Sequence, residues 1–236
     1  MMKDLCTQLF KKFTVPLKNR NPILINNSFY MYTDNMDSLN LIKNRTYEPK
    51  ITKLLNNSLK KDSIMLDIGA NIGYYTLLSG QICKKVYAFE PEKDNYRILE
   101  KNIHLNSING KIPENKIIAE NLALSDKMQE LELEIQPFNK GGHSIVKNGR
   151  NTKWHKQIVQ ATTLDEYFNN KDCPDYIKID VEGYEAQVIN GGRNVFRNAK
   201  LIVFEDNSSL AYNLIKDLGF KLYRIDSNHN YYAIKK

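Results

Sequence analysis

The sequence predicts an α/β fold: a doubly wound, mostly parallel sheet that ends in a C-terminal antiparallel hairpin. Three observations support this. Short apolar runs alternate with helical patterns from residue 64 to residue 218. The runs 64–68 and 85–90 are almost continuously apolar, as buried parallel strands are. The last two runs, 220–225 and 231–235, are joined by a polar turn, which suggests a hairpin that places one antiparallel strand in the sheet.

The elements in between follow from periodicity and from signals at their ends. Pro91 is expected at a helix start, Thr163 and Glu166 form a capping box, and Gly219 occupies a C-cap position. The predicted strands are 64–68, 85–90, 116–120, 131–135, 157–161, 176–181, 201–205 and the two of the hairpin. The predicted helices are one after Tyr47-Glu48-Pro49 through about Lys61, 71–81, 92–106, a short one after Thr163, 184–190 and 209–218.

The chain divides into a basic N-terminal extension, residues 1–46, and a cofactor-binding domain, residues 47–236. Residues 1–61 carry 11 Lys/Arg against 4 Asp/Glu, whereas residues 62–236 carry 23 of each. The extension is expected to hold a short amphipathic helix around Leu5 to Phe13 and a β-ribbon over 22–46, and to form a cap on the acceptor side. A basic loop or hairpin insertion is expected at 137–156, where five Lys/Arg meet no acid.

Composition excludes several classes of protein. With 236 residues the chain fits one α/β domain, and no apolar stretch reaches the roughly 18 residues of a membrane span. Cys6, Cys83 and Cys173 are scattered and odd in number, which predicts reduced thiols in a cytoplasmic protein without a signal peptide. Basic segments attract anionic or lipid-linked partners, so at most peripheral membrane contact is expected. No motif indicates specific nucleic-acid binding, and the oligomeric state is undetermined.

The turn after the first strand indicates an adenosine-type cofactor. Gly69 and Gly73 follow the apolar strand that carries Asp67, and Glu90 ends the next strand, about 20 residues on, where such folds bind ribose hydroxyls. A dinucleotide site would have a glycine at the position of Asn71, to admit a pyrophosphate. A phosphate would also sit poorly beside Asp67, whereas a sulfonium or an ammonium group would not. These residues therefore favour S-adenosylmethionine.

The chain also resembles the FkbM-type methyltransferases. The resemblance is carried by blocks that occur in one order between residues 47 and about 206. They are Tyr47-Glu48-Pro49, Leu66 to Thr76, Phe89-Glu90-Pro91, Asn121 to Ser125, Thr163-Leu164-Asp165, Ile177 to Glu185, Gly191-Gly192 and Phe204-Glu205. The family implies a Rossmann-like class I methyltransferase fold, S-adenosylmethionine as cofactor, and acceptors that are mostly hydroxyls of sugars, glycans or other natural products.

Two groups of site residues are predicted. The cofactor-binding group is Glu48, Asp67, Gly69, Asn71, Gly73, Tyr74, Glu90 and Asn121; Glu48 is taken from the resemblance, and Asn121 is expected to contact adenine unless it is simply a turn residue. The catalytic group is Lys178, Asp180, Glu182 and His143. Asp180 or Glu182 would orient the acceptor or act as general base, with Lys178 paired to one of them. The alternative is a purely structural ion-pair network, and no metal ligand is assigned.

These expectations give one leading function and two alternatives. The leading one is an O-methyltransferase that acts on a hydroxyl of a small-molecule sugar, a glycan or a glycoconjugate. An enzyme of the same fold could instead methylate a nitrogen or a carboxylate of a peptide or an acidic sugar. The third hypothesis is a non-catalytic cofactor-binding module.

Overall fold

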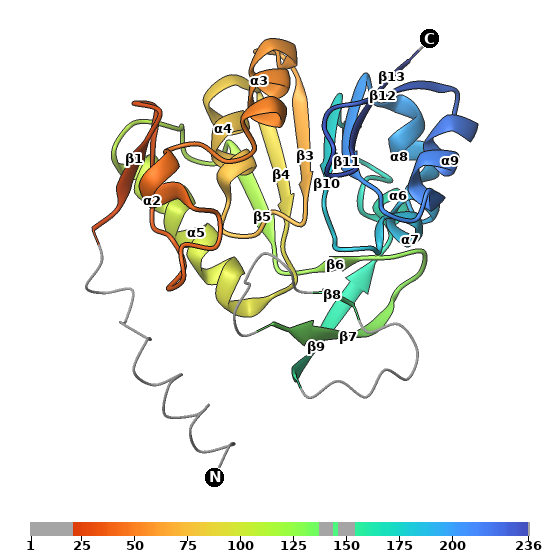
Figure 1. Ribbon diagram of the computed structural model, residues 1–236, viewed down its shortest axis with the longest axis horizontal. Coiled ribbons are helices and arrows are strands. Elements are labelled where there is room, and N and C mark those ends of the chain that lie inside the picture. The colour runs from red at the N-terminus through yellow and green to blue at the C-terminus, as the bar shows by residue number, and fades with distance from the viewer. Residues whose placement is uncertain (1–20, 137–143, 146–153, 236) are drawn as a thin grey trace.

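The structure is a computed structural model that describes residues 21–136, 144–145 and 154–235 (Figure 1). The predicted N-terminal helix and His143 lie outside these residues, as does most of the insertion. The central sheet has the strand order β12-β13-β11-β10-β3-β4-β5. Its strands are β3 (Ile64–Ile68), β4 (Lys85–Phe89), β5 (Ile117–Glu120), β10 (Tyr176–Ile179), β11 (Leu201–Glu205), β12 (Phe220–Arg224) and β13 (Asn230–Lys235).

The sheet confirms the predicted topology. Strands β5, β4, β3, β10 and β11 are parallel, and β13 runs antiparallel to both β11 and β12. Strand order reverses between β3 and β10, the strand pair from which the chain winds outward in both directions. In doubly wound sheets ligands bind at this switch point, beyond the carboxyl ends of the strands.

Helices cover both faces of the sheet (Figure 1). Helices α3 (Pro49–Ser58), α4 (Tyr74–Ile82) and α5 (Lys93–Ile108) lie on one face, and α6 (Leu164–Tyr167), α7 (Glu185–Asn190), α8 (Arg193–Asn198) and α9 (Leu210–Asp217) lie on the other. Alternate residues of one strand serve the two faces: Met65 packs with the α4 side, whereas Leu66 packs with the α7–α9 side. The wholly buried strands are apolar for this reason.

Helix boundaries depart from the prediction at two turns. Helix α4 begins at Tyr74 and not at residue 71, because Asn71 (φ 51°) and Gly73 (φ 98°) adopt left-handed backbone conformations in the turn. Helix α5 begins at Lys93 and not at Pro91, since the Glu92 carboxylate caps the backbone N–H groups of Asp94 and Asn95. Helix α8 was not predicted. The Thr163 cap of α6 is confirmed, and Gly219 (φ 92°) follows α9 as expected.

A second sheet lies beside the first. It has the order β6-β9-β7-β8, with β6 (Ala123–Leu124), β7 (Gln129–Ile135), β8 (Ser144–Ile145) and β9 (His155–Thr162). The predicted strands 131–135 and 157–161 belong here and not to the central sheet. Both strands alternate between more buried and more exposed residues, so one face of each strand is exposed to solvent. In Figure 1 this sheet lies below the carboxyl ends of the central strands.

The described part of the N-terminal extension is integrated into the domain. The hairpin of β1 (Ile23–Ile25) and β2 (Phe29–Met31) matches the first part of the β-ribbon predicted over 22–46. The rest of that range does not continue the ribbon, since residues 41–44 form the short helix α2 (Leu41–Asn44). Ile25, Phe29 and Met31 are fully buried in the same core as α3 and α4. Of the helices formed by the described residues, none has the length and apolar character that a membrane crossing requires.

Two buried asparagines of α5 hold this hairpin in place. Asn102 accepts a hydrogen bond from the Tyr32 N–H (2.7 Å) and donates to the carbonyls of Tyr32 (3.1 Å) and Ile72 (2.8 Å). Asn106 bonds to both backbone groups of Tyr30. Because these backbone groups are removed from water, their partners cannot be supplied by solvent.

We expect Asn102→Ala to lower the free energy of unfolding by about 2–3 kcal/mol, because it leaves buried backbone groups unpaired. Urea denaturation would measure it. Asn109→Ala, at the exposed end of the same helix, is the matched control and should cost less than about 1 kcal/mol. Equal losses for the two variants would contradict the anchoring role of Asn102.

Candidate functional site

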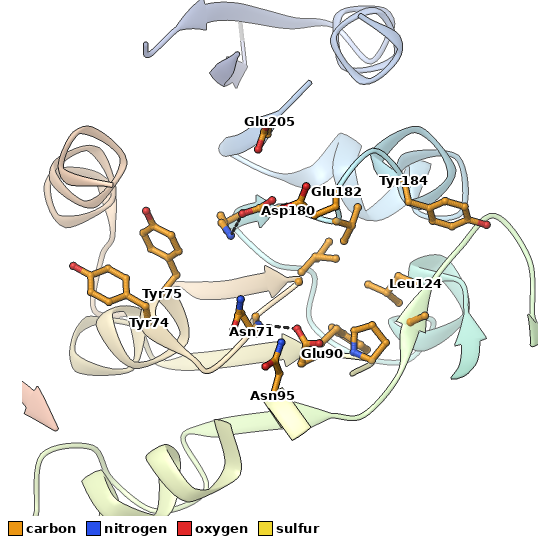
Figure 2. Close-up of a pocket in the computed structure, with 18 of the residues that line it drawn as sticks. Asn71, Tyr74, Tyr75, Glu90, Asn95, Leu124, Asp180, Glu182, Tyr184 and Glu205 are labelled. Atoms are coloured by element: carbon orange, nitrogen blue, oxygen red, sulfur yellow. Dashed lines mark hydrogen bonds and ion pairs between the residues drawn. The ribbon is translucent and has the colours of Figure 1, made fainter. Parts of the chain in front are cut away.

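A cavity of about 280 Å³ lies at the carboxyl ends of the central strands. Each strand around the switch point delivers a residue to it: Gly69 follows β3, Glu90 follows β4, Asp180 follows β10, and Glu205 ends β11. Figure 2 shows Glu90, Asn71 and Asn95 on one side of the cavity and Asp180, Glu182 and Glu205 on another. The position agrees with the general rule for open α/β sheets.

The turn after β3 requires its first glycine. The Gly69 N–H bonds to the Phe89 carbonyl at 3.0 Å, and its φ is 75°. A Cβ atom at residue 69 would lie 1.8 Å from the Asp180 carbonyl oxygen. Only glycine lets the β3 turn pass this close to the end of β10. Gly73 meets a different need, since a Cβ there would lie 2.6 Å from the Leu99 side chain of α5.

Glu90 is the most constrained acid in the cavity. It is 6 % exposed, and its carboxylate accepts hydrogen bonds from the backbone N–H of Asn71 (2.8 Å) and of Glu92 (2.9 Å). Burial raises its pKa to about 8, although these two N–H groups oppose the shift. A buried carboxylate held by one donor on each oxygen keeps lone pairs for hydroxyl donors of a ligand.

The wall next to Glu90 is apolar. We call it the apolar half of the cavity; its residues are Phe89, Pro91, Leu122, Leu124, Leu133 and Ile145. Leu133 and Ile145 come from β7 and β8 of the second sheet, which therefore closes this half. Gln157 of β9 fixes that sheet to the Glu90 turn, because its amide donates to the Pro91 carbonyl at 3.1 Å. This half suits a flat, weakly polar ring beside a hydroxylated group.

The opposite wall is charged. We call it the charged half of the cavity; its residues are Glu48, Lys178, Asp180, Glu182 and Glu205. The predicted ion pair is present: Lys178 Nζ lies 3.0 Å from Asp180 Oδ2 and 5.0 Å from the centre of the Tyr75 ring. Burial alone would lower the pKa of Lys178, but Asp180, Asp67 and Glu48 together raise it above its ordinary value. Lys178 is therefore a permanent cation.

The loop after β10 places Glu182 in an unusual backbone conformation. Glu182 has φ 52° and Gly183 has φ 90°, and the Glu185 carboxylate holds the loop by accepting from the N–H of Val181 (3.2 Å) and Gly183 (3.1 Å). Partial removal from water raises the pKa of Glu182 to about 7, and repulsion from Asp180 and Glu205 adds to the shift. A carboxyl that titrates near neutral pH is suited to proton transfer.

Glu48 lies in the charged half and not beside Glu90. Its backbone is left-handed (φ 39°) at the N-cap of α3, and its carboxylate accepts a hydrogen bond from the Tyr75 hydroxyl at 2.9 Å. Burial raises its pKa, and Lys178 opposes this. Rings of Tyr47, Tyr74 and Tyr75 pack together at 5.2–6.0 Å between centres. This tyrosine cluster separates Glu48 from the protein core.

Three predicted residues support the cavity without lining it. Asp67 is fully buried beside Lys178 on the neighbouring strand, and its carboxylate accepts from the Thr76 hydroxyl at 2.6 Å. Gly73 packs on α5. Asn121 donates to the carbonyls of Glu90 (2.8 Å) and Pro91 (3.0 Å), so its amide shapes the Glu90 turn. By contrast Glu48, Gly69, Asn71, Tyr74, Glu90, Lys178, Asp180 and Glu182 all line the cavity.

Several lining residues were not predicted. Asn95, Tyr75 and Glu205 come from α5, α4 and β11. Asn95 could have been suspected from its position on the first turn of the helix after Glu90. Leu133 and Ile145 carried no signal, because they approach the cavity only through the second sheet. Among the described residues there is no group of three or more His, Cys, Asp or Glu arranged to hold a metal ion.

Solved structures with a similar fold include methyltransferases. A methyltransferase FkbM from Methylobacillus flagellatus KT aligns with a TM-score of 0.51 and 14% identity, over 73% of this chain and 43% of that one. A precorrin-6y C5,15-methyltransferase from Geobacter metallireducens GS-15 aligns with a TM-score of 0.51 and 14% identity, over 92% and 100%. The fold is therefore that of the Rossmann-like methyltransferases.

The sequence comparisons define the family. The "Methyltransferase FkbM domain" matches residues 67–225. The chain belongs to the FkbM methyltransferase family. It is also 25% identical over 161 residues to the hexuronic acid methyltransferase AglP of Haloferax volcanii. That match covers 67% of this chain and 62% of AglP, so it spans less than two thirds of the relative.

Proposed function

We propose that the protein transfers the methyl group of S-adenosylmethionine to a hydroxyl of a sugar, a glycan or a glycoconjugate. The observation that carries the donor assignment is Glu90, buried at the end of β4 with one backbone N–H on each oxygen. This carboxylate can accept hydrogen bonds from the two ribose hydroxyls of the donor. The apolar half would receive the adenine ring.

The charge of the cavity supports this donor over a dinucleotide. Among the described lining residues the acids are Glu48, Glu90, Asp180, Glu182 and Glu205, and the basic residue is Lys178. A pyrophosphate would face repulsion from these carboxylates, whereas a sulfonium would be attracted. In this turn the backbone passes closest to the end of β10 at Gly69. The dinucleotide fingerprint has a second glycine where this chain has Asn71, which also argues against a dinucleotide.

The charged half can orient a hydroxyl and remove its proton. S-adenosylmethionine, when bound, supplies a methyl group on a positively charged sulfur. Lys178 fixes the Asp180 carboxylate through their 3.0 Å ion pair, and Asp180 would orient the acceptor hydroxyl. Glu182, with its pKa near 7, would take the hydroxyl proton as the acceptor oxygen bonds to the methyl carbon and the bond from that carbon to the donor sulfur breaks. We assign the general base to Glu182 because Asp180 is neutralised by a permanent cation.

The acceptor class is supported by the relative. AglP is named for a hexuronic acid, which is a sugar. The resemblance to FkbM-type methyltransferases also implies acceptors that are mostly hydroxyls of sugars, glycans or other natural products. Cys83 and Cys173 are both free thiols, which is compatible with a reducing compartment, and we propose that the reaction takes place in the cytoplasm.

Donor binding is the first test. We expect S-adenosylmethionine and S-adenosylhomocysteine to raise the melting temperature of the purified chain, with a stabilisation of about 2.7 kcal/mol at 100 times the dissociation constant. NAD⁺ at the same concentration is the control and should leave the melting temperature unchanged. Stabilisation by NAD⁺ and not by the sulfonium nucleosides would remove the donor assignment.

A further inference from the structure

The charged half of the cavity carries more negative than positive charge. Asp180 is matched by Lys178, but three carboxylates remain. Glu48 accepts from the neutral Tyr75 hydroxyl at 2.9 Å, and Glu205 accepts from the neutral Asn207 amide at 2.8 Å. Glu182 lies beside Asp180 and Glu205 and is repelled by both. Among the described residues, no lysine or arginine forms an ion pair with these three carboxylates, and all three line the cavity.

The described residues that line the neighbouring hollow include no lysine or arginine. It shares Leu39, Tyr47 and Glu48 with the cavity and continues past them over α2 and the start of α3. Its other lining residues are Asn40, Asn44, Thr46 and Pro49. Amides and a hydroxyl are groups that bind sugar hydroxyls, and an acidic group would find no cation among them. Glu48 is the one charged residue among the described residues that line this hollow, so an acceptor extending along it would meet no cation there.

We propose that the charged half selects a neutral sugar or an amino sugar as acceptor and rejects a hexuronic acid. This inference rests on the proposed function and narrows its substrate class. Above about pH 7, where Glu182 is ionised, a sugar carboxylate placed near the accepting hydroxyl would meet like charges on Glu48, Glu182 and Glu205. Such juxtaposition is costly in a partly desolvated site. The donor adds one net positive charge, because its sulfonium and ammonium groups are offset by one carboxylate. With Lys178 this makes two positive charges against the carboxylates of Glu48, Asp180, Glu182 and Glu205.

The carboxylates of the charged half also favour binding of neutral sugars and amino sugars. Carboxylates are strong acceptors for the hydroxyl donors of a neutral hexose, and they attract the ammonium of a hexosamine. The chain would thus differ in acceptor from AglP, the hexuronic acid methyltransferase to which it is 25% identical. The difference would come from the residues of the charged half.

The experiment is a competition among matched acceptors. The full chain is incubated with isotopically labelled S-adenosylmethionine and an equimolar mixture of methyl glycosides of hexoses, hexosamines and hexuronic acids, and the methylated products are quantified by mass spectrometry. We expect hexoses and hexosamines to be preferred over hexuronic acids by at least about tenfold in kcat/KM, which is the effect of a like charge at short range. The preference should weaken at high salt.

Glu205→Gln tests the electrostatic cause. Glutamine keeps an oxygen for the Asn207 amide while removing one negative charge, so hexuronic acids should gain about fivefold relative to hexoses. Glu114→Gln, on an exposed loop away from the cavity, is the matched control and should leave the preference unchanged. An unchanged preference in Glu205→Gln would overturn the inference.

Two further outcomes distinguish a failure of the proposed acceptor selectivity from a failure of the proposed sugar methylation. Equal or greater methylation of hexuronic acids would overturn the inference and leave sugar methylation standing. If no sugar is methylated although donor binding is shown by the melting temperature, the proposed acceptor class fails and this inference fails with it.

Discussion

Glu90→Gln is expected to weaken S-adenosylmethionine binding by about 10²–10³-fold at about pH 9, where the Glu90 carboxyl is ionised, because hydrogen bonds to a charged group contribute about 1.5–3 kcal/mol each. The carboxylate offers an acceptor to both ribose hydroxyls, whereas the amide offers one oxygen and one donor. The fold should survive, since the side chain keeps its volume and one of its two backbone partners. Isothermal titration calorimetry with S-adenosylhomocysteine would measure the loss.

The same substitution should leave a signature in the ligand-free protein. The pKa of Glu90 is raised from 4.5 to about 8 in the fold. Between these values the folded chain holds a proton that the unfolded chain has released, so stability falls as pH rises towards 8. Glu90→Gln should remove this part of the decline, and urea denaturation at pH 5 and pH 8 would show a shallower slope. An unchanged affinity together with an unchanged slope would remove Glu90 from the site.

Glu182→Gln is expected to lower kcat by about 10²–10⁴-fold, the usual contribution of a general base, while donor affinity changes little. In the unmodified enzyme kcat should rise as pH increases through about 7 and then level off, because a base works only when its pKa is below the pH. Asp180, Glu205 and Glu185 face this carboxyl and raise its pKa, and Lys178 lowers it. The pH dependence near 7 should vanish in the variant.

Asp180→Asn provides the comparison. It preserves shape beside Lys178 but removes the charge of the ion pair. Under our assignment it impairs acceptor orientation, so it raises KM for the acceptor and lowers kcat, yet the pH dependence near 7 remains. If Asp180→Asn abolishes that dependence and Glu182→Gln does not, the general base is Asp180.

The sequence predicted the fold well because each strand around the switch point is encoded locally. The apolar runs of β3, β4, β10 and β11 could be identified one at a time, and the residue at or after each strand end could be placed at the shared edge. Gly69, Glu90 and Asp180 were found in this way. The Lys178–Asp180 ion pair was also predicted, because residues two apart on a strand point to the same face and because an isolated buried charge is costly.

Other features depend on contacts between distant segments. Asn121 was expected in contact with adenine, but its amide bonds to the Glu90 and Pro91 carbonyls, and that choice depends on how two loops meet. Glu48 matched a family block, which does not reveal that it faces Lys178. Leu133 and Ile145 reach the cavity because β7 and β8 form a separate sheet, and alternation alone cannot tell which sheet a half-exposed strand joins.

The sequence by itself determined the doubly wound sheet, the glycine turn and the acid at each strand end, since these depend on short-range pattern and on strand direction. Only the tertiary structure decided that the cavity has an apolar and a charged half, and that among the described residues of the second half four carboxylates outnumber one cation. Net charge along the chain is positive, yet the cavity is acidic. The physical reason is that electrostatic interaction depends on distance in space, which the order of residues does not fix.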